Sequence, residues 1–206
     1  MDPNAGKRTL ANKLSREELQ AKLDAETFHR TTVSFYKYVI IENPQELRDA
    51  LFAKWSQWEC LGRIYVSREG INAQMNVPQH HWDAFDAFIH GLEYFHDVPF
   101  KCAVTEKTEG KSFLKLVVKV REQIVADGLQ PEDYDVTDVG AHLTAKDWNE
   151  AIEKHDPVVV DMRNHYESEI GHFEGAVLPE AETFREELPM VLEKLKGQED
   201  RKILLY

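Results

Sequence analysis

A polar run follows the apolar segment at residues 158–160, and its residue types suit an active-site loop. A buried strand there delivers Asp161 and Arg163 at its carboxyl end. We expect Glu167 to reach back to Arg163 as a charge-assisted pair, with a glycine turn placing His172. These four side chains either support an active site at the edge of a sheet or brace the loop without touching a substrate.

A second polar group alternates with apolar residues in KSFLKLVVKVR, residues 111–121. Period-two alternation places leucines and valines on one strand face, which suits a side covered by helices. The opposite face carries Lys111, Phe113, Lys115, Val117, Lys119 and Arg121. Neighbouring strands add Tyr36, Tyr38, Arg63, Tyr65, Asn72 and Gln74. Rings among cations on an open sheet stack bases and hold phosphates, which predicts an RNA-contacting surface; a plain solvated face is the alternative.

A tight turn is expected at Arg68, Glu69 and Gly70, between two strand-like segments. Gly70 is expected to supply a positive φ, which glycine adopts without a Cβ clash. Arg68 and Asn72 either contact RNA or the target base, or belong to a hairpin turn that binds nothing.

The elements that position these residues form an α+β unit over residues 30–125. Strand-like segments at 31–41 and 62–78 alternate with amphipathic helices that begin near Pro44 and near residue 80. A hairpin around Glu109 and Gly110 is expected to close the unit. This order predicts a ferredoxin-like or acylphosphatase-like sandwich with helices on one face of its sheet.

The flanking segments differ in character. Residues 1–29 are a polar tail with a short helix, in which Ser15 and Glu18 form a possible capping box. Residues 126–142 are acidic, carry turn formers and are expected to be a linker.

Residues 143–206 change to a pattern of helix, buried strand, loop, helix and buried strand. Helices are expected from residue 145 and over 183–197, and strands over 156–161 and 201–206. This order predicts a βαβ unit in a parallel sheet. Ligands of such sheets bind beyond the carboxyl ends of the strands, so the chain is expected to stop before its active-site loop, as an incomplete domain.

Composition narrows the function classes. The chain has 206 residues and a formal net charge of -12. Basic and acidic side chains balance over residues 1–125, so the whole acidic excess lies in 126–206, and the first part can still present a basic face. Cys60 and Cys102 fit no metal or disulfide pattern and are expected to be reduced, mostly buried thiols. No apolar run is long enough to span a membrane, and no signal peptide is expected.

Asp161-Met-Arg163, Glu167, Gly171-His172 and Gly175-Ala176 resemble the signature of rhodanese domains, whose reactive cysteine follows the strand that corresponds to RKILLY. That resemblance implies a nucleophilic cysteine just after Tyr206, in a loop whose N–H groups favour a thiolate. Within this chain no residue takes the role of catalytic nucleophile.

The segments TVSFYKY, GRIYVSREGINAQ, KSFLKLVVKVREQIVADG and TFREELP, with the signature above, resemble the bacterial rhodanese-containing, oxygen-dependent tRNA uridine hydroxylases. That resemblance implies a cytoplasmic oxidoreductase that forms 5-hydroxyuridine at the wobble position of tRNA. Dioxygen would be its co-substrate, with neither metal nor flavin. Because the cysteine loop and a cysteine-rich tail are missing, the chain alone is not expected to be active. A rhodanese-type sulfurtransferase and a non-catalytic RNA- or partner-binding module are the alternatives.

Overall fold

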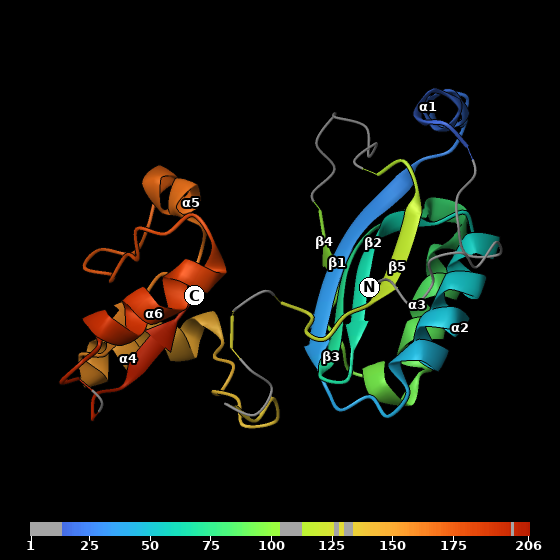
Figure 1. Ribbon diagram of the computed structural model, residues 1–206. Coiled ribbons are helices and arrows are strands. Elements are labelled where there is room, and N and C mark those ends of the chain that lie inside the picture. Colours follow the sequence, from blue (N-terminus) through green and yellow to red (C-terminus); the bar gives the residue numbers. More distant parts are fainter. Residues whose placement is uncertain (1–13, 104–112, 126–127, 130–133, 199) are drawn as a thin grey trace. The chain divides into compact units, whose positions relative to one another are not determined.

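The computed structural model describes residues 14–103, 113–125, 128–129, 134–198 and 200–206. The chain divides into two compact units, Met1–Val125 and Ala126–Tyr206, and each is described by itself (Figure 1).

The first unit is built on a five-stranded sheet in the order β4-β1-β3-β2-β5. Its strands are β1 (Arg30–Tyr38), β2 (Leu61–Ser67), β3 (Gly70–Pro78), β4 (Lys101–Cys102) and β5 (Leu116–Val120). All neighbouring strands are antiparallel except β2 and β5. Helices α2 (Pro44–Gln57) and α3 (Trp82–His90) lie together on one side of the sheet (Figure 1). The predicted α+β sandwich is therefore confirmed.

Local signals explain both helices. Asn43 caps α2, because its side chain accepts a hydrogen bond from the Glu46 N–H, and Pro44 occupies the first turn. Helical spacing turns Leu51 and Trp55 into the sheet, where both are fully buried. Helix α3 ends at His90, turns Phe85 and Ile89 into the core, and is flanked by the 3-10 turns η1 (Gln79–His81) and η2 (Glu93–Phe95).

One topological prediction is wrong. The segments around β4 and β5 do not form a hairpin, because these strands lie at opposite edges of the sheet. Strand β5 instead pairs parallel with β2, which lets Val118 join the buried core. Alternation shows which face of a strand is buried, but it does not specify the partner strand. The expected turn at Glu109 and Gly110 lies outside the described residues.

Two local predictions about the first unit are confirmed. Helix α1 (Arg16–Asp24) begins with a capping box, in which Ser15 and Glu18 exchange hydrogen bonds with each other's backbone. Gly70 has φ 145°. A Cβ at Gly70 would collide with the carbonyl oxygen of Lys37 on the neighbouring strand, so close strand approach requires glycine here.

The second unit contains the parallel strand pair β6 (Val158–Val160) and β7 (Ile203–Leu205). Helix α4 (Ala145–His155) precedes β6, and α5 (His165–Ile170) and α6 (Phe184–Lys194) lie between the strands. The parallel pairing is as predicted, whereas α5 was expected to be loop. The rhodanese-like assignment of this unit remains a prediction. Residues 134–142 contain neither helix nor strand.

Candidate functional site

The side of the first unit's sheet that faces away from α2 and α3 is the first candidate site. A continuous row crosses four strands there, because Tyr36 pairs with Asn72, Asn72 with Tyr65, and Tyr65 with Lys119. We call this surface the open sheet face. It comprises Ser34, Tyr36, Arg63, Tyr65, Asn72, Gln74, Lys101, Val117, Lys119 and Arg121.

Two aromatic rings of the open sheet face each have a cation above them. The Lys101 Nζ lies 5.7 Å from the centre of the Tyr36 ring. The Arg121 guanidinium carbon lies 5.5 Å from the centre of the Tyr65 ring. Both distances are within the range of cation–π attraction, and Tyr36 remains 49% exposed.

The charged side chains in the strands of this sheet are all basic. None of the residues in β1 to β5 is acidic. Arg63 and Gln74 are exposed and paired across β2 and β3, in the row next to the tyrosines. An anion that approaches this face therefore meets cations and amides along the strands.

Both ends of the open sheet face are closed by the chain itself. At one end Asn76 and the side chain of Arg30 are buried, and the Arg30 guanidinium donates to the Glu26 carboxylate at 2.7 Å and 2.8 Å. At the other end the segment after β5 folds back, and the Ile124 N–H donates to the Glu69 carboxylate at 2.6 Å. Between these contacts Tyr36, Arg63, Gln74 and Lys101 are exposed.

The residues predicted to contact RNA differ in how exposed they are. Tyr36, Arg63 and Gln74 are exposed on the face as expected. The Asn72 amide donates to the Ile124 carbonyl at 3.3 Å, so it holds the covering segment. Tyr38 lies half-buried in the row of Gly70, at the closed end.

The other predicted contacts lie at the edges of this surface. Arg68 is exposed in the two-residue turn between β2 and β3. Phe113 and Lys115 precede β5, which begins at Leu116, and Lys111 lies outside the described residues.

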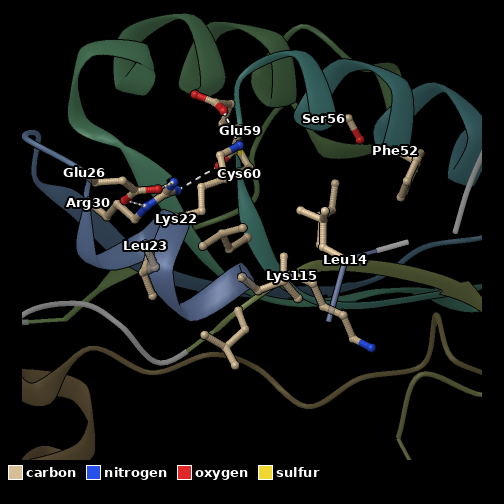
Figure 2. Close-up of a pocket in the computed structure, with 14 residues that line it drawn as sticks. Leu14, Lys22, Leu23, Glu26, Arg30, Phe52, Ser56, Glu59, Cys60 and Lys115 are labelled. Atoms are coloured by element: carbon tan, nitrogen blue, oxygen red, sulfur yellow. Dashed lines mark hydrogen bonds and ion pairs between the residues drawn. The ribbon is translucent and has the colours of Figure 1, made fainter. Parts of the chain in front are cut away.

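Lys115 lines a pocket of about 270 Å³ beside α1, α2 and the start of β5 (Figure 2). Four other charged groups of the pocket pair with each other, Arg30 with Glu26 and Lys22 with Glu59. Burial raises the pKa of the Cys60 thiol to about 12, so this cysteine is not a nucleophile at neutral pH. Cys102, expected to be buried, is exposed, because its two-residue strand lies at the sheet edge.

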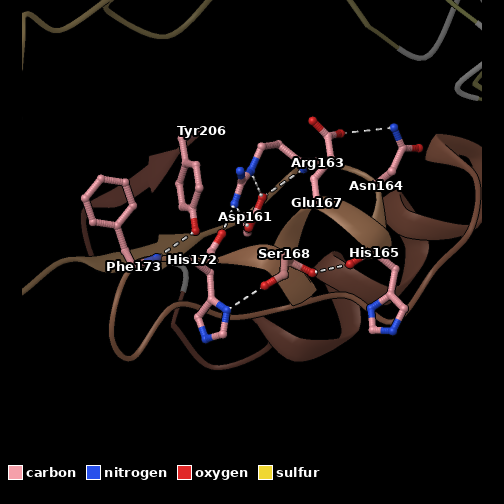
Figure 3. A network of polar contacts seen from close by, with 10 residues as sticks. Asp161, Arg163, Asn164, His165, Glu167, Ser168, His172, Phe173 and Tyr206 are labelled. Carbon is pink, nitrogen blue, oxygen red and sulfur yellow. Dashed lines mark hydrogen bonds and ion pairs between the residues drawn. The ribbon is translucent and has the colours of Figure 1, made fainter.

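The second candidate site follows β6 in the second unit (Figure 3). The Arg163 guanidinium donates to both oxygens of Asp161, at 3.0 Å and 2.7 Å, and to the Gly171 carbonyl at 2.7 Å. Asp161 is fully buried. Burial opposes ionisation of this carboxyl, but the hydrogen bonds from the Arg163 side chain and N–H outweigh it and hold the pKa of Asp161 below its ordinary value.

The predicted pairing of Glu167 with Arg163 is wrong. Glu167 accepts a hydrogen bond from the Asn164 amide at 3.3 Å, beside the first turn of α5. Asp161, two residues from Arg163, offers a bidentate partner at shorter range. The exposed His172 donates from Nδ1 to the Ser168 carbonyl at 2.8 Å, because a carbonyl oxygen only accepts.

Further residues complete this second site without any local sequence signal. The Arg163 guanidinium lies 5.1 Å from the centre of the Tyr206 ring, whose hydroxyl accepts the Phe173 N–H at 3.1 Å. Glu187 on α6 is buried, and one of its carboxyl oxygens has no hydrogen-bond partner within the described structure. Burial and the nearby Asp161 raise the pKa of Glu187.

Neither site has the donor set of a metal centre. Within the described residues, no group of three or more His, Cys, Asp or Glu side chains is arranged to hold a metal ion. In that same part of the chain, no helix is long and apolar enough to cross a membrane.

Comparison with known proteins relates both units to one group. Residues 30–124 match the family described as UPF0176 acylphosphatase like domain. A Leptospira interrogans protein named tRNA uridine(34) hydroxylase is 53% identical over 200 residues, which cover 97% of this chain and 54% of that protein. A protein of the same name from Erwinia tasmaniensis is 46% identical over 197 residues, which cover 96% of this chain and 56% of the relative. The chain thus spans about half the length of the curated relatives it matches.

Proposed function

This chain belongs to the tRNA uridine(34) hydroxylase family, and on that premise we propose that the full-length protein hydroxylates the wobble uridine of tRNA to 5-hydroxyuridine. The observation that carries the proposal is the identity of 53% over 97% of the chain, because it includes both candidate sites. Dioxygen is the proposed co-substrate, with neither a resident metal nor a flavin, and tRNA is the proposed partner.

The second unit is proposed to support the reactive group. The bidentate contact between Arg163 and Asp161 fixes the loop beyond the carboxyl end of β6, beside Tyr206. A cysteine just after Tyr206 in the full-length protein would follow β7 and stand at the same strand ends, where parallel sheets bind ligands. A thiolate that adds to C6 of uracil makes C5 electron-rich, so that C5 can take up one oxygen atom of dioxygen while an external two-electron donor reduces the other atom to water. Loss of the C5 proton and release of the thiolate from C6 then restore the uracil ring as 5-hydroxyuridine.

The test is made in cells with the full-length gene. Transfer RNA from a strain that lacks the gene is digested to nucleosides, and 5-hydroxyuridine is measured by mass spectrometry. We expect the nucleoside to be absent and to return with the wild-type gene. It should not return with a variant in which the cysteine after Tyr206 is changed to serine, although that variant still binds tRNA. A deletion strain with unchanged 5-hydroxyuridine would refute the proposal, and thiocyanate release from thiosulfate by the purified protein would favour a sulfurtransferase.

A further inference from the structure

The two tyrosines of the open sheet face have the spacing of a base-stacking platform. Tyr36 on β1 and Tyr65 on β2 lie in one row with Asn72 of β3 between them. Neighbouring strands are about 4.8 Å apart, so the two tyrosine backbones are separated by about 10 Å across the sheet. One or two nucleotide steps of an extended single strand cover such a distance, which allows one unpaired base to lie on each ring.

Each ring also has a cation beside it, which can pair with the phosphate of a nucleotide whose base lies on the ring. Lys101 lies over the ring of Tyr36, and Arg121 lies over the ring of Tyr65. In each pair the cation and the ring come from different segments of the chain. A nucleotide brings a flat aromatic base and a phosphate together, and these pairs provide a partner for both parts. Arg63 adds an exposed cation in the next row.

The contacts at the two ends of the open sheet face favour an RNA strand that lies across the β-strands. Asn76 and the Arg30 side chain are buried at one end, and toward the other end Ile124 is bonded to Glu69 and to Asn72 of the tyrosine row. Lys101, Tyr36, Gln74 and Arg63 are exposed on the rest of the face, and Tyr65 and Lys119 are half-buried. These residues lie across the strands, which suits a single strand laid across the sheet, whereas a duplex keeps its base faces stacked inside the helix.

We propose that the open sheet face binds single-stranded RNA, with one unpaired base stacked on Tyr36, a second on Tyr65, and the phosphates held by Lys101, Arg63 and Arg121. The inference rests on the proposed function in taking the loop of a tRNA as the RNA. It goes beyond that function by assigning recognition to a surface that contains none of the residues around Asp161.

The test uses the 206-residue chain and two labelled RNA hairpins, one with an unpaired anticodon loop and one of similar length closed by the shortest stable loop. Binding is measured by fluorescence anisotropy at several salt concentrations. We expect the anticodon hairpin to bind more tightly. Tyr36→Ala and Tyr65→Ala should each weaken its binding by roughly 5- to 150-fold, since stacking contributes about 1–3 kcal/mol per base.

Two matched variants separate stacking from charge and from general disruption. Tyr36→Phe keeps the ring and should bind within about twofold of the wild type. Lys101→Gln should weaken binding and reduce the slope of log K against log salt by about 0.7, as expected for one lost phosphate contact to a single strand. Lys37→Gln is the control, because Lys37 stands on the same strand as Tyr36 but turns to the helix side, where it pairs with Asp97.

The outcomes distinguish this inference from the proposed function. Equal binding of both hairpins, or unchanged binding by Tyr36→Ala and Tyr65→Ala with circular dichroism unaltered, would overturn the stacking platform. No RNA binding at low salt would also overturn it, even if cells make 5-hydroxyuridine with the full-length gene. Conversely, a chain that passes every binding test while the deletion strain retains 5-hydroxyuridine would sustain the platform and refute the hydroxylase assignment.

Discussion

The two candidate sites differ in their relation to the interior of their units. In the first unit the open sheet face lies opposite a continuous apolar core, and its principal ring, Tyr36, is 49% exposed. In the second unit the apolar core is small, built on Val158, Val160 and Val191, and Asp161 and Glu187 are themselves buried. The exposed residues of the open sheet face are therefore separate from the core that stabilises the first unit, whereas in the second unit Asp161 and Glu187 are part of the buried interior.

The largest effect is expected from the core of the first unit. Phe85 is fully buried against the rings of Phe35, Trp55 and Phe100. Phe85→Ala should lower the free energy of unfolding by about 3–5 kcal/mol, because it removes apolar burial and leaves a cavity. Urea unfolding followed by tryptophan fluorescence measures the change. Tyr36→Ala serves as the control and should change stability by less than about 0.5 kcal/mol; a comparable loss there would show that the face and the core are not separable.

An intermediate effect is expected at Asp161. Asp161→Asn should destabilise the second unit by roughly 1.5–3 kcal/mol at neutral pH, because it weakens the charge-assisted bonds to Arg163. The folded-state pKa of Asp161 is depressed, so its contribution is present above the ordinary pKa of 3.8 and is lost as the pH falls through the folded value. The difference between wild type and variant should shrink in acid.

Fluorotryptophan NMR during urea unfolding gives this measurement, because Trp148 packs on Phe173 and Tyr206 in the same unit. Glu167→Gln is the matched control, and it should have little effect because Glu167 accepts only a long bond from Asn164. If Glu167→Gln proved as costly as Asp161→Asn, the assignment of the Arg163 partner would be wrong.

The smallest effect, with the opposite sign, is expected at Glu187. The raised pKa of Glu187 means that its contribution is favourable below its ordinary pKa of 4.5 and is lost as the pH rises through the folded value. Glu187→Gln should therefore stabilise the second unit at neutral pH by about 1 kcal/mol, because a neutral amide is not repelled by Asp161. The same NMR signal, followed from neutral pH into acid, should show the gain disappearing. The neighbouring, exposed Glu186→Gln should show no such dependence.

Several features of the fold were predictable because they depend on neighbours along the chain. The capping box at Ser15 follows from residues three positions apart, and the faces of β1 and β3 follow from alternation. The positive φ of Gly70 was predictable because the residue stands beside a tight turn and glycine adopts such a φ without strain. The parallel pairing of β6 and β7 follows from an apolar strand on each side of a helix.

The errors share a different cause, which is the choice among distant partners. Alternation placed Val118 on the buried side but not beside β2, where a free sheet edge received it. Arg163 had two carboxylates within reach, and only the folded loop shows that Asp161 meets it with both oxygens. Nothing in the local pattern marked Glu187, which is buried because α6 turns it inward.

The sequence by itself determined the α+β order of the first unit, the βαβ order of the second and the residue types of both candidate sites. Backbone hydrogen bonding and the spacing of apolar residues depend on residues a few positions apart, so these features can be predicted from short stretches of sequence. Only the tertiary structure decided that Lys101 meets Tyr36, that Arg121 meets Tyr65 and that Ile124 closes one end of the sheet. These contacts join segments far apart in the chain, and the packing of the common core selects them.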